Sequence, residues 1–232
     1  MSLLDDVRTC RSCLDEPEHL ERFAKRFELY AGYPKKFPPT IGAAGEAKLL
    51  FMGISPRLSN NYVLDAANEN MDGEFAKLSG NKDQFGRDYL KSYAAPDEPG
   101  EPHYRSYVAL IEQLYPGRAV EQVAAFTDLY HCAYPIKPPY FDSSYKPLPA
   151  NSPCAVKFFE RIISQVRPLA VITRGEPQTR FFKRYFVKGP VNYHTRYRIV
   201  VNEIETVLLP LKWQMDQAWV LQMIREIDPD AA

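Results

Sequence analysis

The chain has 232 residues, which is long enough for one α/β domain with its own core, and we expect a single domain over residues 1–232. Its 29 basic and 29 acidic residues balance, which excludes wholesale electrostatic attraction as the main mode of nucleic-acid binding but leaves room for a local basic groove. The N-terminal stretch MSLLDDVRTC is acidic where a secretory signal is apolar, and no apolar run is long enough to span a bilayer. We therefore expect a soluble cytoplasmic protein with no membrane partner, and a monomer is favoured.

Apolar spacing along the chain predicts helices that alternate with short buried strands. The stretch KLLFMGISP is a short apolar run that ends in Gly53, and YRSYVALIEQLYP carries Tyr107, Leu110 and Leu114 on one helical face. In chain order we predict a helix at 14–31, an extended loop at 32–47, a strand at 49–52, a polar excursion at 57–102, a helix at 104–116, a strand at 123–135, a long loop at 136–153, a helix at 154–168, a strand at 169–175, a helix at 177–186, one or two strands at 196–210 and a helix at 212–227.

This alternation is typical of a sheet covered by helices on both faces. We predict a three-layer α/β/α fold with a mostly parallel central sheet of about four strands. Ligands of such sheets bind at the carboxyl ends of the strands, so the loops that follow the strands are the candidate binding region.

Four cysteines occur in a two-plus-two layout, Cys10 with Cys13 and Cys132 with Cys154. The first pair precedes every predicted strand, which disfavours a thioredoxin-type redox motif. Four thiolates with this spacing suit a tetrahedral metal or an iron–sulfur cluster. The alternative is a set of unrelated thiols, because free cysteine often packs as a small buried hydrophobe.

The order of four short motifs resembles that of the uracil-DNA glycosylase superfamily, and most closely its branch with a four-cysteine iron–sulfur cluster. The motifs are the N-terminal C-x-x-C, a strand ending in FMGISP, a strand ending in FTDLYHC, and the segment CAVKFFERIISQVRPLAVITRG. The resemblance implies that Cys10, Cys13, Cys132 and Cys154 hold one structural [4Fe–4S] cluster. A zinc ion would satisfy the same thiolates.

The resemblance also implies that the loop GISPR holds the activated water and the sugar of a flipped nucleotide. Gly53 and Pro56 match the relatives. Ser55 and Ile54 stand where relatives carry asparagine or glutamate, and neither is a strong activator of water. Ser55 is the candidate catalytic residue of this loop, and Gly53, Ile54 and Pro56 are candidate substrate contacts.

Two further positions correspond to residues that contact the base in the family. Phe85 in DQFGRDYL resembles the aromatic that stacks on the flipped base, with Tyr62 as a second candidate and a core position as the alternative. Asp128 in FTDLYHC stands where the family has the asparagine that reads the base, so it is a candidate catalytic and substrate-binding residue. An ionised carboxylate only accepts hydrogen bonds, so either Asp128 is protonated, or the ligand presents donors, or the side chain simply binds backbone amides.

The late histidine-proline motif of the family corresponds to VLLPLKWQ. Pro210 matches its proline, and Pro210 and Leu211 are candidate substrate contacts. Leu209 takes the position of the histidine that stabilises the departing base, and leucine cannot donate to an anion. His194 is the remaining candidate for that role from another part of the chain.

Basic and aromatic residues alternate in RFFKRYFVKGP and NYHTRYR, a pattern that suits phosphate contact and base stacking. The alternative is a solvated helix face with core aromatics. Trp213 and Met215 stand where relatives insert a wedge into the duplex. The basic residues are Arg180, Lys183, Arg184, Lys188, Arg196 and Arg198.

The expected function is therefore that of a uracil-DNA glycosylase-like protein, which binds DNA and hydrolyses the N-glycosidic bond of a damaged or deaminated base. The departures at Ser55, Asp128 and Leu209 favour an alternative, a member of the fold that binds nucleic acid or a nucleotide without cleaving it. A third possibility is a structural zinc or cluster module that serves as an interaction partner.

Overall fold

The structure is a computed structural model, and it places most of the second half of the chain together with parts of the first. The prediction of a helix at 14–31 lies outside the described residues. The single domain over 1–232 stays a prediction. The residues that the structure describes are 3–10, 12, 40–43, 45–53, 57–58, 102–129, 131, 134–135, 153–212 and 214–232.

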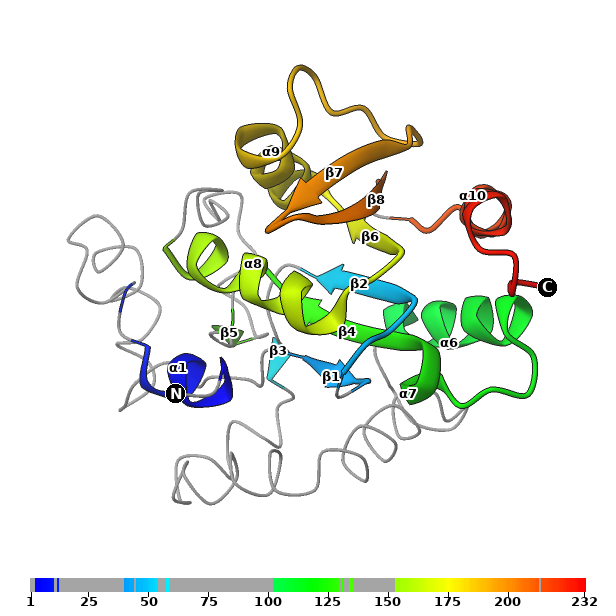
Figure 1. The fold of residues 1–232 in the computed structure, drawn as a ribbon, viewed down its shortest axis with the longest axis horizontal. Coiled ribbons are helices and arrows are strands. Elements are labelled where there is room, and N and C mark those ends of the chain that lie inside the picture. Colours follow the sequence, from blue (N-terminus) through cyan, green and yellow to red (C-terminus); the bar gives the residue numbers. More distant parts are fainter. Residues whose placement is uncertain are drawn as a thin grey trace.

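Helices and strands alternate along the described chain, as predicted (Figure 1). The elements are α1 (Leu3–Thr9), β1 (Ile41–Gly42), β2 (Leu49–Gly53), β3 (Arg57–Leu58), α6 (Pro102–Leu114), α7 (Val120–Val123), β4 (Ala124–Asp128), β5 (Tyr134–Pro135), α8 (Pro153–Val166), β6 (Ala170–Arg174), α9 (Glu176–Tyr185), β7 (Tyr197–Val201), β8 (Ile204–Leu211) and α10 (Gln217–Ile227).

The main sheet has the order β1-β4-β2-β6-β8-β7. Strands β4, β2, β6 and β8 are mutually parallel, whereas β1 and β7 pair antiparallel at the two edges. This confirms the predicted α/β fold with a mostly parallel sheet. Strands β7 and β8 are the two predicted at 196–210, whereas β1 falls in the segment predicted as an extended loop. The strand predicted at 123–135 is shorter, because β4 ends at Asp128 and residues 134–135 pair with β3 instead.

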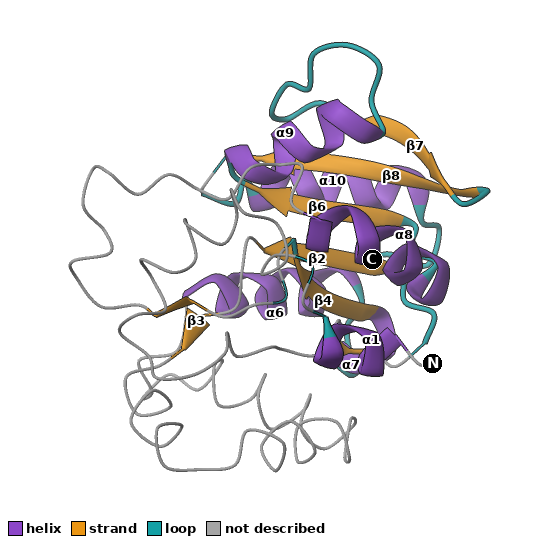
Figure 2. Ribbon diagram, turned by 90° about the vertical axis from the view of Figure 1, so that its left-hand side faces the viewer, coloured by secondary structure: helices purple, strands orange, loops and turns teal. Residues whose placement is uncertain are grey.

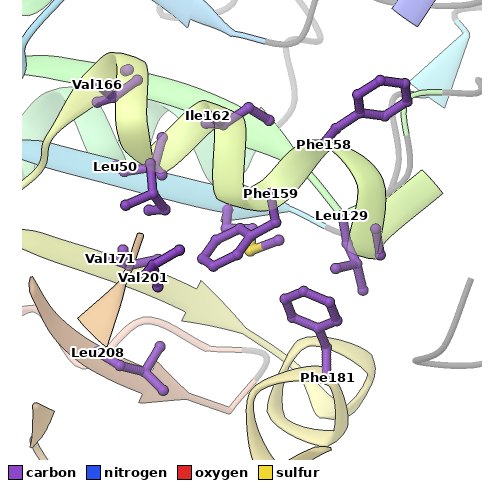
Figure 3. Packing of buried hydrophobic residues seen from close by; sticks show 14 of the residues in the cluster. Leu50, Leu129, Phe158, Phe159, Ile162, Val166, Val171, Phe181, Val201 and Leu208 are labelled. Atoms are coloured by element: carbon purple, nitrogen blue, oxygen red, sulfur yellow. The ribbon is translucent and has the colours of Figure 1, made fainter. Parts of the chain in front are cut away.

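Side chains of the parallel strands alternate between two helical layers, because successive residues of a strand point to opposite faces. Leu50 and Met52 join the core formed with α8 and α9, and Leu49 and Phe51 join the core formed with α6 and α10. Figure 2 shows the sheet between these two layers. Figure 3 shows residues of the first core, in which aromatic side chains such as Phe159 of α8 meet strand residues. Central strands are buried on both faces, which explains their continuous apolar sequences.

A polar cluster ties the C-terminus to the amino ends of the strands. Lys48, just before β2, places its Nζ 2.9 and 2.8 Å from the two carboxylate oxygens of Asp228 and 2.6 Å from Asp230. The hydroxyl of Tyr115 donates to Asp228 at 2.7 Å. The last residue, Ala232, donates its N–H to the carbonyl of Leu114 at 2.8 Å. At the amino ends of the strands, these polar groups therefore have a structural role.

Candidate functional site

The candidate binding region lies at the carboxyl ends of the parallel strands, where the strand order creates a switch point. From β2 the chain runs to β4 on one side, then crosses back to β6 on the other side of β2 and continues to β8. The connections after β2 and β6 therefore leave in opposite directions. Ligands of open α/β sheets bind at such a switch point.

Asp128 lies directly against Gly53 at this edge. The two residues pair in register as the last residues of β4 and β2. A Cβ atom on Gly53 would stand 2.2 Å from Oδ1 of Asp128, so the carboxylate fills the space that any larger residue would need. The N–H of Leu129 donates to the carbonyl of Gly53 at 3.0 Å and holds the two strand ends together. Glycine is therefore required here for close approach of a carboxylate.

Arg174 and Tyr107 complete this group. Arg174 ends β6, one residue beyond the register pair of Met52 and Thr173, on the strand that borders β2. Its guanidinium carbon lies 5.6 Å from the centroid of the Tyr107 ring, which comes from α6. That ring packs on Phe51, with centroids 4.4 Å apart. The phenol of Tyr107 therefore lies near the strand ends, on the same face of the sheet as the carboxylate of Asp128.

The three polar side chains act on one another electrostatically. Burial raises the pKa of Tyr107, the charge and hydrogen bonding of Arg174 oppose that rise, and the carboxylate of Asp128 adds to it. The net effect is upward, so the phenol stays protonated at neutral pH and is a donor. A hydrogen-bond acceptor, a phenol and a guanidinium are therefore gathered at the switch point. We call Gly53, Tyr107, Asp128 and Arg174 the strand-end site.

Sequence reasoning found only part of this site. It selected Gly53 and Asp128, read Tyr107 as a core residue of a helix, and passed over Arg174. An arginine at the end of the otherwise apolar strand LAVITRG was the available signal, because a charged residue at the carboxyl end of a buried strand faces the binding edge.

The remaining predicted contacts divide into two groups. Ile54, Ser55, Pro56 and Phe85 lie outside the described residues. Pro210 and Leu211 belong to β8 and are buried, and Leu211 packs in the core with α6 and α10.

Leu209 lies in that same core and is fully buried. It pairs in register with Ile172 of β6, two residues before Arg174. His194 donates its N–H to the carbonyl of Pro210 at 2.9 Å, and its exposed ring lies 5.4 Å from the ring of Trp219 on α10. His194 is therefore near the carboxyl end of β8, on the α10 side.

Of the cysteines, the structure describes the side chain of Cys10. It is partly buried beside the core of α8 and α9, and its Sγ lies 3.4 Å from the hydroxyl of Ser12. Cys13 and Cys132 lie outside the described residues, as does the side chain of Cys154. Within the part of the chain that is described, no group of three or more His, Cys, Asp or Glu residues could hold a metal.

Described residues that precede Cys10 and Cys132 in the sequence contact α8. Asp6 of α1 forms an ion pair with Arg161 of α8, the helix in which Cys154 is the second residue. His131, the neighbour of Cys132 in sequence, packs its ring edge-on against Phe158, with centroids 5.5 Å apart. Phe158 is one helical turn beyond Cys154. Residues near Cys10 and Cys132 in the sequence therefore contact α8, the helix that carries Cys154.

Replacing Cys132 by alanine is expected to abolish metal retention if the four cysteines form one site, because three thiolates leave a cluster or zinc incompletely ligated. The measurement is the iron, sulfide and zinc content of protein purified without air. Ser12→Ala, which changes a neighbour of Cys10, is the control and should keep the wild-type content. Full metal content in Cys132→Ala would refute a four-cysteine site.

The basic residues predicted to contact nucleic acid differ in their surroundings. Lys183, Arg184 and Lys188 are exposed near the end of α9, and within the described residues they form no ion pair. The guanidinium of Arg184 lies 5.7 Å from the ring of Tyr185, which is also exposed. The others pair with glutamates: Arg180 with Glu176 at 2.5 Å, Arg196 with Glu226 at 2.9 Å and Arg198 with Glu205 at 3.4 Å.

The two wedge candidates also differ. Trp213 lies outside the described residues. Met215 is partly buried against the core of α6 and α10, so a packing role accounts for it. Among the six basic residues, those near the end of α9 are therefore the ones that are exposed without an ion pair to another described residue.

No protein-family model matches this sequence, and a comparison with curated proteins finds no similar chain. None of the helices in the described ranges is both long and apolar enough to cross a membrane. Support for a function therefore comes from the strand-end site and its surroundings.

Replacing Gly53 by alanine tests the strand-end site without removing a polar group. The new methyl displaces the carboxylate of Asp128, yet the free energy of unfolding should change by less than about 1 kcal/mol, since a short side chain can rotate away. If the strand-end site reads a base, discrimination between bases should fall to that of Asp128→Ala. Gly45→Ala is the control, because its Cβ would meet nothing within 4 Å. Unchanged base discrimination in Gly53→Ala would contradict the assignment.

Proposed function

We propose that this protein binds DNA that carries a damaged or deaminated base, draws that base out of the duplex, and hydrolyses its N-glycosidic bond. The observation that carries the proposal is the carboxylate of Asp128, which lies on Gly53 at the switch point beside Tyr107 and Arg174. The order of motifs in the sequence, which resembles that of uracil-DNA glycosylases, supports the same conclusion.

The chemistry of the strand-end site suits recognition of a base edge. An ionised Asp128 accepts hydrogen bonds, so it favours a base with an exocyclic amine over one with a carbonyl at the same place. Hydrolysis breaks the bond between C1′ of the sugar and the base nitrogen and forms a bond from C1′ to a water oxygen. Negative charge develops on the departing base, which takes up the proton that the water loses. The guanidinium of Arg174 is a cation at this end of the strands that would stabilise such charge.

A binding function without hydrolysis is the second candidate. It is favoured by Leu209, which takes the place of the family's histidine and is fully buried in the core. No donor from that position helps the base to leave. Under this candidate, Asp128 and Arg174 bind the flipped base, and the glycosidic bond stays intact.

By resemblance, Cys10, Cys13, Cys132 and Cys154 would hold a [4Fe–4S] cluster, with zinc as the alternative. The group would supply a cross-link between the N-terminal segment, the chain after β4 and the start of α8. The contacts of α1 and His131 with α8 support this arrangement. Its proposed role is structural.

The test uses DNA duplexes of about 25 base pairs that differ in one base. The central base is 5-hydroxycytosine, 5-hydroxyuracil, uracil or unmodified cytosine. Tighter binding to a modified duplex than to the unmodified one supports base recognition. Release of free base and an alkali-labile abasic site distinguishes hydrolysis from binding alone. Equal affinity for every duplex would overturn the proposal.

A further inference from the structure

A second group of polar atoms lies near the end of β6, outside the strand-end site. The side-chain oxygen and nitrogen of Gln178 and the hydroxyl of Thr173 are buried, and they have no hydrogen-bond partner among the described residues. Both residues are 0% exposed. A buried amide without partners is unfavourable, and in native proteins such a group is explained by a bound water or by a ligand.

Gln178 and Thr173 belong to the same end of the same layer. Thr173 is the penultimate residue of β6, and it faces the layer of α8 and α9 because Val171, two residues earlier, packs there. Gln178 lies one helical turn before Phe181 and Phe182, which pack in that layer. Helical side chains tilt toward the N-terminus, so the amide extends toward the carboxyl end of β6.

The junction between β6 and α9 is held in place by backbone contacts. Gly175 has a φ of 102°, which favours glycine, and its N–H donates to the carbonyl of Leu211 at 3.0 Å. The hydroxyl of Thr179 donates to the carbonyl of Gly175 at 3.0 Å. The first turn of α9 is thereby fixed to the ends of β6 and β8, and the amide of Gln178 is held on a rigid element.

We propose that Gln178 and Thr173 form a binding subsite for the edge of a nucleic-acid base, a planar heterocycle with a donor beside an acceptor. An amide offers both functions side by side, and it matches uracil or cytosine by a half-turn of its terminal torsion. The hydroxyl of Thr173 adds one more donor or acceptor. The choice of ligand rests on the proposed function.

A phosphate or another anion suits this junction less well. The start of a helix attracts anions through its free N–H groups, but Pro177 removes one of them. Glu176 adds a negative charge to the same turn. Both residues weaken attraction for an anion, whereas a neutral base edge needs only the amide and hydroxyl.

The experiment compares wild type with Gln178→Met and Thr173→Val, which remove the polar atoms with little change of shape. Thermal unfolding is followed without ligand and with free uracil or free cytosine at 10 mM. Without ligand, each variant should unfold about 2–4 °C above wild type, because an unpartnered polar group is gone. The increase in Tm caused by base should fall at least tenfold in Gln178→Met.

Thr206→Val is the matched control. Thr206 is also buried with an unpartnered hydroxyl, but it pairs with Ile199 in β7, away from the strand ends. Its variant should also unfold at a higher temperature, and it should keep the full response to base. A loss of that response in Thr206→Val would overturn the assignment of the subsite.

Three other outcomes overturn the inference. The first is a lower Tm of Gln178→Met than of wild type, which means that the amide is already satisfied by structural water. The second is an unchanged response of that variant to base. The third is the lack of any response of wild type to either base. These results are separate from the oligonucleotide test. A response that depends on Gln178 in a protein that ignores modified DNA would refute only the proposed function.

Discussion

Replacing Asp228 by alanine is expected to lower the free energy of unfolding by about 3 kcal/mol at pH 7, near the lower end for breaking a buried ion pair. The carboxylate is 2% exposed and accepts from Lys48 at 2.8 and 2.9 Å and from Tyr115 at 2.7 Å. Its removal leaves the hydroxyl of Tyr115 without that acceptor. The loss is moderated because Asp230 still contacts Lys48.

This loss should depend on pH with a definite sign. Burial alone raises the pKa of Asp228, but hydrogen bonds from Lys48, Tyr115 and the N–H of Asp230 outweigh burial and lower it. A lowered pKa contributes stability above the unfolded value of about 3.9, and that contribution disappears as the pH falls through the folded pKa. The difference between wild type and Asp228→Ala should therefore shrink between pH 5 and pH 3.

The same cluster should also make the folding stability fall at alkaline pH. Burial alone lowers the pKa of Lys48, but hydrogen bonds to Asp228 and Asp230 outweigh it and raise the pKa. A raised pKa contributes stability below the unfolded value of about 10.4, and that contribution is lost as the pH rises through the folded pKa.

Urea unfolding at several pH values measures the loss of stability at acid pH and at alkaline pH. Asp230→Asn is the control, because its side chain is 59% exposed and its pair with Lys48 should contribute less than about 1 kcal/mol. Equal losses in the two variants, or a loss in Asp228→Ala that persists unchanged at pH 3, would show that this cluster does not anchor the C-terminus.

Replacing Asp128 by asparagine is expected to change base preference about 10- to 100-fold, the range for one good pair of hydrogen bonds to a base edge. A carboxylate accepts from the exocyclic amine of 5-hydroxycytosine and repels the carbonyl of 5-hydroxyuracil. An asparagine amide donates to that carbonyl and accepts from the neighbouring N–H. Wild type should prefer 5-hydroxycytosine, and the variant should shift toward 5-hydroxyuracil.

The two bases differ only at one exocyclic position, so the ratio of dissociation constants for their duplexes isolates this contact. Asp230→Asn removes the same charge at the opposite edge of the sheet and should leave the ratio unchanged. An unchanged ratio in Asp128→Asn would mean that this carboxylate does not read the base.

Local sequence patterns were sufficient for most of the secondary structure. The helices predicted at 104–116, 154–168 and 177–186 correspond to α6, α8 and α9 within a few residues. The helix predicted from 212 begins at Gln217, because Asp216 caps it by accepting from the N–H of Trp219 at 3.1 Å. Such ends depend on single capping contacts, which apolar spacing does not reveal.

The candidate site was only partly predictable, for reasons visible in particular residues. Gln178 is polar within an amphipathic segment, so the pattern places it at the surface, whereas packing of α9 on β6 buries it completely. Leu209 matches a motif position by order along the chain, yet it is buried, because β8 is covered by core on both faces here. The order of motifs along the chain does not predict which face of the sheet a side chain points to, or which strand is its neighbour.

By itself, the sequence determined the α/β class, the buried strands and the location of Gly53 and Asp128 at strand ends, because apolar periodicity and strand ends are local properties of the chain. Only the tertiary structure decided the strand order and the antiparallel edges. It also decided the meeting of Asp128 with Tyr107 and Arg174. These residues come from β4, α6 and β6, and contacts between distant segments arise only when the sheet orders its strands and the helices cover it.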